Sequence, residues 1–193
     1  MADSKRKKVF ICPLDWGWGH ASRTIPVIYL LSQHQDFDIL LGLSGSSGQM
    51  LQKEFPGLES VQMPSCHITY SSGASQVWKI LIQLPKILMT IVQERIYLKN
   101  LIKSRKIACI ISDHRYGLFH KDLLSILIIH QLHMQFPRKL KVFETLFNWF
   151  QNRVLRQFDQ IWIPDYPGEM SIAGRLSDAP LKMKHIHYIG ILS

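Results

Sequence analysis

Short apolar runs alternate with helical patterns along the whole chain, and this alternation constrains the fold more than any other feature. The apolar runs that read as strands span 8–14, 37–43, 58–63, 107–112, 124–130, 159–163 and 187–191. Helical patterns lie between them, near 22–34, 47–55, 75–105 and 139–157. This order predicts a doubly wound α/β fold, with a mostly parallel sheet and helices on both faces. Right-handed crossovers then place the strand C-termini on one edge, where such sheets bind ligands.

Charge and cysteine content narrow the partners and the compartment. Lys and Arg total 23 against 14 Asp and Glu, and the net charge of +9 favours anionic partners: phosphates, nucleic acid or an acidic membrane surface. The 47% of hydrophobic residues excludes a disordered chain. Three cysteines without a CxxC pair argue against a disulfide framework and for a cytoplasmic setting. The chain shows neither a signal peptide nor a transmembrane run.

The pattern over 75–105 predicts one long helix, which Pro85 should kink or split. Its first half, Val77–Val92, is apolar nearly all round, and from Gln76 to Lys106 there are seven basic residues and one acidic. One interpretation is a buried helix followed by a solvated face. The other is an apolar and basic patch that touches the inner face of a membrane. We favour the buried helix and keep peripheral membrane contact as the alternative.

The most informative segment follows the first strand and opens the first helix: residues 15–23 read DWGWGHASR. Gly17 and Gly19 allow a tight turn and a close approach of ligand to backbone. Free N–H groups at a helix start favour an anion. Ser22 is a good N-cap residue and Pro26 fits best in a first turn, so the sequence predicts a helix start near Ser22.

His20 and Arg23 would then lie at the ligand-binding edge. A histidine beside a glycine turn can accept a proton from a hydroxyl, although a ring that only hydrogen-bonds the loop is the simpler interpretation. A dinucleotide fingerprint is the rival for this segment, but its third glycine position is Ser22. The acids that might hold a ribose, Asp36 and Asp38, stand at the beginning of the second strand, on the wrong edge.

Two further polar groups follow buried strands on the same edge. Residues 112–117 read SDHRYG, and Asp113 there has three interpretations: it pairs with Arg115, orients His20 or binds a substrate hydroxyl. His130 follows the next strand, with His133 nearby. Because these two histidines have no Cys or carboxylate companion, we expect no metal site. His185 and His187 read as surface residues at the entry of the last strand.

Taken together, these motifs resemble the N-terminal domain of GT-B glycosyltransferases, which is Rossmann-like. The likeness is to the enzyme that adds N-acetylglucosamine to the undecaprenyl-linked cell-wall precursor, and more closely to a group of predicted bacterial glycosyltransferases. It rests on Gly19-His20 and on four ordered segments: SDHRYGL at 112–118, IHQL at 129–132, WIPD at 162–165 with GRLS at 174–177, and YIGILS at 188–193. One departure is His114, where the family pattern leads us to expect Asn.

The resemblance implies a sugar transfer from a nucleotide-sugar to a hydroxyl acceptor, with no metal and no other cofactor. Residues 1–193 would form the acceptor-side half, and the donor-binding half would be absent from this chain. His20 would act as the base or as an acceptor-positioning group, with Asp113 as the second catalytic residue. The residues expected to contact the ligands are Gly17, Gly19, Arg23, Arg115 and His130. The acceptor would be a hydroxyl compound, lipid-linked in the resembled enzyme. A non-catalytic domain that binds phosphate or nucleic acid is the alternative.

Overall fold

A computed structural model describes residues 6–65, 76–132, 141–174 and 185–192, with the backbone alone for 76–81, 142 and 143. His133, Cys66 and residues 175–177 of the GRLS segment therefore lie outside the described residues. Seven parallel strands form one sheet in the order β3-β2-β1-β4-β5-β6-β7. The strands are β1 (Lys7–Pro13), β2 (Phe37–Leu43), β3 (Glu59–Gln62), β4 (Ile107–Asp113), β5 (Leu124–Ile128), β6 (Gln160–Ile163) and β7 (Ile186–Tyr188). The helices are α1 (Trp18–Ser32), α2 (Gly45–Glu54), α3 (Gln76–Arg105), α4 (Lys141–Leu155) and the short 3-10 turn η2 (Gly168–Met170).

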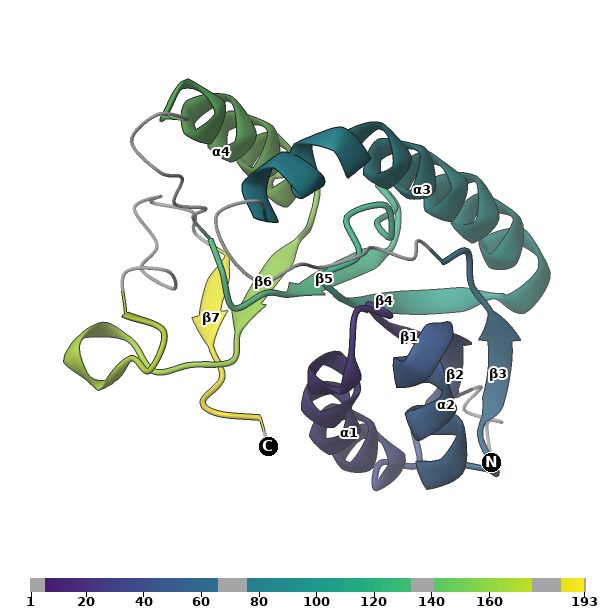
Figure 1. Ribbon diagram of the computed structural model, residues 1–193. Coiled ribbons are helices and arrows are strands. Elements are labelled where there is room, and N and C mark those ends of the chain that lie inside the picture. The colour runs from purple at the N-terminus through teal and green to yellow at the C-terminus, as the bar shows by residue number, and fades with distance from the viewer. Residues whose placement is uncertain (1–5, 66–75, 133–140, 175–184, 193) are drawn as a thin grey trace.

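Helices cover both faces of the sheet, so the predicted doubly wound fold is confirmed. Figure 1 shows α1 and α2 on one face and α3 and α4 on the other. The side chains of β1 alternate between these layers: Val9 and Ile11 join the core with α1 and α2, while Phe10 and Cys12 join the core with Leu98 of α3. A third cluster fills the space between β5, β6 and α4. Strands buried on both faces read as continuous apolar runs, as the sequence shows.

The strand order reverses between β1 and β4, and this reversal places the candidate site. The chain first winds outward from β1 through β2 to β3, then crosses back to β4 and winds the other way. The last residues of the two central strands, Pro13 and Asp113, are register partners. Ligands of doubly wound sheets bind in the crevice outside such a reversal. The loops after β1, β4 and β5 border that crevice.

Helix α1 begins at Trp18, so the predicted start near Ser22 is wrong. Gly17 is the N-cap and has a φ of 119°, which side-chain-bearing residues rarely adopt. This glycine conformation, rather than a serine cap, turns the chain into the helix. The Ser22 hydroxyl donates to a backbone carbonyl inside the helix, and Pro26 lies in the helix interior.

Helix α3 is continuous over Gln76–Arg105 with Pro85 inside it, so of the two predicted effects of Pro85, a kink or a split, the split is wrong. Within the described ranges, no helix combines the length and the apolar character that crossing a membrane requires. At the far end of the sheet, His185 and His187 are exposed beside and within β7, as predicted. Cys12 and Cys109 are free thiols.

Candidate functional site

The predicted polar residues come together at the C-terminal edge of the sheet. His20 lies in the first turn of α1, Asp113 is the last residue of β4, and His130 follows β5. Arg23 links His20 to His130, because its guanidinium contacts both rings. The prediction that the glycine turn, Asp113 and His130 share one edge is therefore confirmed.

The carboxylate of Asp113 is the centre of this cluster, and its side chain is only 1% exposed. Its Oδ2 lies 2.8 Å from Nδ1 of His20, and its Oδ1 lies 2.9 Å from Nδ1 of His114. The guanidinium of Arg23 stands 3.6 Å from the same carboxylate. Of the alternatives for Asp113, the orientation of His20 is confirmed. The pairing with Arg115 is wrong, because that guanidinium is bound elsewhere.

The contact with Asp113 favours one tautomer of His20. An ionised carboxylate can only accept hydrogen bonds, so Nδ1 of His20 carries the proton that it donates to Asp113. A bare Nδ1 would instead set two lone pairs face to face. Nη2 of Arg23 also lies 2.9 Å from this nitrogen in hydrogen-bond geometry, so Arg23 and Asp113 compete for Nδ1. The ionised carboxylate, which can only accept, favours the tautomer with the proton on Nδ1. The Nε2 atom of His20 therefore keeps its lone pair.

The backbone of His114 explains the departure from the family pattern. His114 has a φ of 56°, in the left-handed region where Asn, Asp and His are enriched over other side chains. Its backbone N–H donates to the carbonyl of Ile128 at 3.1 Å, which holds the loop against β5. A histidine at an expected asparagine position thus preserves the turn and adds an imidazole to the cluster.

The charge states in the cluster follow from burial and from the hydrogen bonds. Burial alone would raise the pKa of Asp113, but hydrogen bonds from His114 and His20 outweigh it and hold that pKa well below its usual range. Burial, followed by the charges of His114 and Arg23, lowers the pKa of His130 to about 4. This agrees with the 2.8 Å contact in which Nη1 of Arg23 donates to Nδ1 of His130. His130 is thus neutral at physiological pH, with its proton on Nε2.

The depressed pKa of His130 predicts an acid-sensitive stability. The unfolded chain takes up a proton near pH 6.5 and the folded chain only near 4, so unfolding is favoured as the pH falls between these values. Because the ring is partly exposed to solvent, we expect this effect to lower the free energy of unfolding by about 1–2 kcal/mol. Urea unfolding at pH 7 and pH 4 should therefore show that His130→Gln loses less stability than wild type. The control is His187→Gln at an exposed position, and an equal loss in His130→Gln and wild type would contradict the assignment.

Arg115 was predicted to contact ligand, but its guanidinium is occupied by protein groups. Its side chain is 1% exposed, and Nη1 donates to Oε1 of Glu94 at 2.7 Å. Nε donates to the carbonyl of Pro13 at 2.8 Å, and Nη2 donates to the Ser44 hydroxyl. The other carboxylate oxygen of Glu94 accepts the backbone N–H of Gly117. Through these hydrogen bonds, Arg115 links the end of β1 and the loop after β4 to helix α3.

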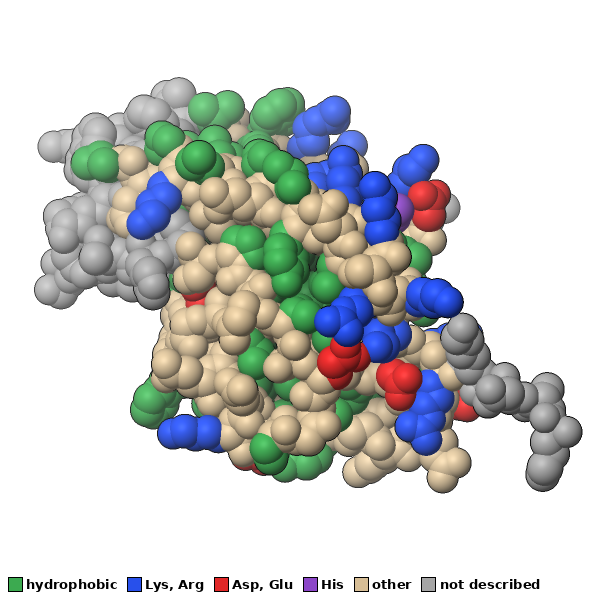
Figure 2. All heavy atoms as spheres, turned by 90° about the vertical axis from the view of Figure 1, so that its right-hand side faces the viewer, with side chains coloured by type: hydrophobic (Ala, Val, Ile, Leu, Met, Phe, Trp, Pro, Cys, Tyr) green, Lys and Arg blue, Asp and Glu red, His purple; other side chains and the backbone are tan. Residues whose placement is uncertain are grey.

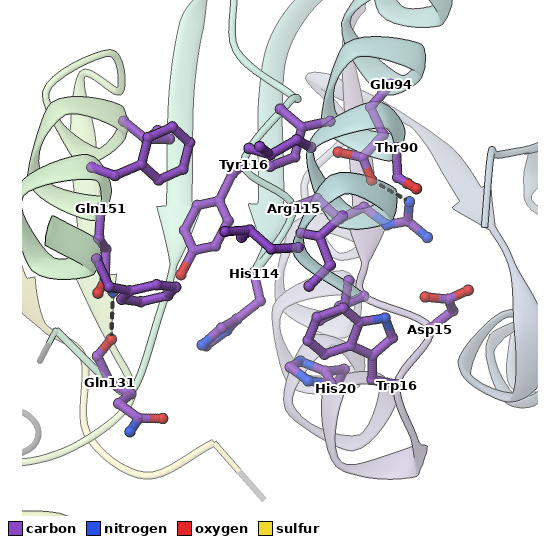
Figure 3. A pocket seen from close by; sticks show the side chains of 18 of the residues that line it. Asp15, Trp16, His20, Thr90, Glu94, His114, Arg115, Tyr116, Gln131 and Gln151 are labelled. Carbon is purple, nitrogen blue, oxygen red and sulfur yellow. Dashed lines mark hydrogen bonds and ion pairs between the residues drawn. The ribbon is translucent and has the colours of Figure 1, made fainter. Parts of the chain in front are cut away.

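A cavity of about 360 Å³ opens above the histidines, between α3 and α4. Its walls are mainly apolar, and Figure 3 shows His20 and His114 together at one end, near Trp16. The apolar wall residues come from the two helices: Leu84, Ile87, Leu88 and Ile91 of α3, and Phe147, Phe150 and Val154 of α4. The polar groups that line it include Asp15, Glu94, Tyr116, His130 and Gln131. The cavity therefore offers an apolar chamber with a polar, histidine-lined end.

Sequence reasoning missed the cavity walls and Glu94. The apolar face of Val77–Val92 was visible, but periodicity does not tell a core contact from a cavity wall. In the described part, one face of α3 lines the cavity and another is exposed, so the buried-helix interpretation holds for one face. Glu94 did leave a signal, because it is the one acidic residue between Gln76 and Lys106.

Three of the clustered residues are also of metal-binding type. The ligand atoms of His20, Asp113 and His114 all lie within 4.8 Å of one another. However, both imidazole Nδ1 atoms donate their protons to the carboxylate, and the Arg23 guanidinium stands 2.9 Å from Nδ1 of His20. A metal cation would have to displace those protons beside a fixed positive charge. The arrangement therefore fits a hydrogen-bonded acid–base cluster better than a metal centre.

The start of α1 lies next to this cluster. An added Cβ at Gly17 or Gly19 would meet no atom within 4 Å, so both residues border open space. The helix has no side-chain hydrogen bond at its N-cap and no acidic residue in its first turn. Its N-terminal N–H groups are thus available to a ligand with negative charge, which remains a prediction for Gly17 and Gly19.

Comparison with known proteins finds likeness in structure and not in sequence. No protein-family model and no curated protein sequence matches the chain. Among solved structures, UGT2 of Phytolacca americana, complexed with UDP-2-fluoro-glucose and pterostilbene, matches 97% of this chain and 54% of its own, at 13% identity and a TM-score of 0.60. MurG of Acinetobacter baumannii matches 85% of this chain and 43% of its own, at 11% identity and a TM-score of 0.50. A UDP-N-acetylglucosamine 2-epimerase matches 95% and 48%, at 13% identity and a TM-score of 0.56.

The chain spans about half the length of the structures that it matches. These neighbours are GT-B proteins, most of them glycosyltransferases, and the epimerase among them shows that the fold alone does not fix the reaction. The all-parallel seven-stranded sheet and the covering helices agree with this likeness. This chain therefore has the fold of one Rossmann-like half of the GT-B architecture.

Proposed function

We propose that this chain is the acceptor-side half of a glycosyltransferase that moves a sugar from a nucleotide-sugar to a hydroxyl group. One observation carries the proposal: His20 is bound through Nδ1 to the buried carboxylate of Asp113, and its ring lines the apolar cavity. A histidine held in this way presents Nε2 as a base to a bound hydroxyl. Asp113 is its positioning residue, because it fixes the tautomer and stabilises the charged ring.

The proposed transfer needs only the acceptor hydroxyl, the nucleotide-sugar and His20. The acceptor oxygen forms a bond to the anomeric carbon while the bond from that carbon to the nucleotide diphosphate breaks. The hydroxyl proton passes to Nε2 of His20, and the departing diphosphate takes the electron pair of the broken bond. The imidazolium formed is stabilised by Asp113, 2.8 Å from Nδ1.

The donor would approach the open edge beside the start of α1. The N–H groups of Gly17 and Gly19 and the nearby cation of Arg23 favour a diphosphate there. Since the chain spans about half of its structural neighbours, we propose that a second half supplies the remaining donor contacts. The UGT2 neighbour was solved with a UDP-sugar analogue and pterostilbene, which supports a donor and an apolar acceptor for this architecture.

The direct test is sugar transfer by a protein that joins this chain to a donor-binding half, with His20→Ala as the decisive variant. The rival function, a non-catalytic binder of phosphate or nucleic acid, predicts instead that the chain alone binds such anions with a steep salt dependence. The glycosyltransferase function therefore predicts transfer only by the two-half protein. The binding function predicts anion binding by the chain alone, with an affinity that falls steeply as the salt concentration rises.

We further propose that α3 and α4 touch an anionic membrane surface. Along one stripe of α3, Ile82, Met89 and Val92 are 75%, 63% and 56% exposed, and Trp149 of α4 is 62% exposed. Figure 2 shows hydrophobic side chains along the top of the molecule, where these helices lie, beside a group of Lys and Arg side chains. An exposed apolar stripe with basic neighbours is the pattern of an interfacial helix.

Vesicle co-sedimentation tests this contact. We expect pelleting with phosphatidylglycerol vesicles at low salt, several-fold less at high salt, and little with phosphatidylcholine. Ile82→Asp should lower the partitioning about tenfold or more, because it replaces an inserted apolar side chain with a charge. Ile172→Asp is the matched control, since that isoleucine is also 75% exposed but follows β6. Equal pelleting with both lipids, or none with either, would exclude the contact.

A further inference from the structure

His114 stands beside His20 in the same cavity and has no task in the step described above. Both rings are bound through Nδ1 to one carboxylate, His20 to Oδ2 and His114 to Oδ1 of Asp113. The ring centroids are 5.1 Å apart, and each side chain is 13% exposed. Figure 3 shows the two rings at the same end of the cavity. One buried carboxylate thus orients two imidazoles toward one space.

The hydrogen bonds define what each ring offers there. Because the carboxylate only accepts, Nδ1 of His114 carries the ring proton and Nε2 is left as an acceptor, as in His20. Burial lowers the pKa of His114, which keeps this ring neutral. Within the described residues, no hydrogen bond reaches Nε2 of either ring.

His130 offers the complementary group. Its Nδ1 accepts a hydrogen bond from Arg23, so its own proton lies on Nε2, a donor. Its ring centroid is 4.6 Å from that of His114, and both rings line the cavity. The polar end of the cavity thus combines two acceptors, on His20 and His114, with one donor on His130.

We propose that His114 and His130 form a second hydroxyl subsite, and that the acceptor is an apolar molecule with hydroxyls on two adjacent carbons. This rests on the proposed function. The reacting hydroxyl donates to Nε2 of His20, while its neighbour donates to Nε2 of His114 and accepts from Nε2–H of His130. Vicinal oxygens lie about one hydrogen-bond length apart, which suits two rings in contact. An acceptor with one hydroxyl would leave the partly buried groups of the second subsite without a partner.

Calorimetric titration of the chain with paired probes tests this subsite without any transfer reaction. We expect naphthalene-2,3-diol to bind about tenfold more tightly than 2-naphthol, as two added neutral hydrogen bonds imply. Naphthalene-2,7-diol, whose hydroxyls are far apart, should bind like 2-naphthol. In His114→Asn the preference for the 2,3-diol over 2-naphthol should fall to within twofold.

Asparagine is the chosen replacement because it tolerates the left-handed backbone of position 114 and is too short to take the place of the imidazole. His187→Asn, at an exposed position, should keep the full preference. Equal binding of the 2,3-diol and 2-naphthol to wild type, binding of neither, or an unchanged preference in His114→Asn would overturn the subsite. A lost preference in His114→Asn together with full transfer by His20→Ala would overturn the general base and leave the subsite standing.

Discussion

Arg115→Met should destabilise the fold by about 3–5 kcal/mol, because it leaves the Glu94 carboxylate buried without its cation. The side chains of the pair are 1% and 3% exposed, and the guanidinium also holds the Pro13 carbonyl and the Ser44 hydroxyl. Burial already raises the pKa of Glu94 against the opposing effect of Arg115. For a domain of this size, such a loss lowers the melting temperature by about 10 °C or more.

A matched control is available on the surface. Arg105 pairs with Glu59 at 2.5 Å, but these side chains are 46% and 37% exposed, so Arg105→Met should cost less than about 1 kcal/mol. Removing both buried charges, with Glu94→Leu and Arg115→Met together, should recover much of the loss. Melting curves and urea titrations of the four proteins measure these differences. Equal stabilities for Arg115→Met and Arg105→Met would show that the buried pair does not hold the loops.

The sequence was sufficient to predict where the site lies. Continuous apolar runs predicted parallel strands, and parallel strands bring the residues that follow them to one edge. That reasoning placed His20, Asp113 and His130 together, although these residues are far apart in the chain. The error at Ser22 was local, since the φ of Gly17 decides where α1 begins, and the predicted split at Pro85 fails because α3 runs through it.

The sequence did not predict which groups the polar side chains bind or the shape of the cavity. Asp113 and Arg115 are two residues apart and of opposite charge, yet each bonds to groups on other elements. Residues two apart share a face only within a strand, but β4 ends at Asp113 and the left-handed φ of His114 turns the chain before Arg115. The cavity forms only when α3 and α4 pack over the strand ends, which no single segment encodes.

His20→Ala should lower the turnover of the complete, two-half protein by about 10²–10⁴-fold, because proton removal from the acceptor hydroxyl typically contributes that much. The loss should fall mainly on kcat, since the apolar cavity still binds the acceptor. Asp113→Asn should also reduce kcat, because an amide can donate to Nδ1 of His20 and favour the wrong tautomer. The double variant should be little worse than His20→Ala alone, as expected when one residue acts through the other.

The central claim is tested most directly by steady-state transfer from a nucleotide-sugar to a hydroxyl acceptor, comparing wild type, His20→Ala and His187→Ala in the two-half protein. His187 is the control because it is exposed in β7, the edge strand, which lies three strands away from β4. With all three proteins folded to the same melting temperature within a few degrees, we expect wild-type kcat in His187→Ala and a loss of two orders of magnitude or more in His20→Ala. A kcat in His20→Ala within threefold of wild type would contradict the assignment of His20 as the base.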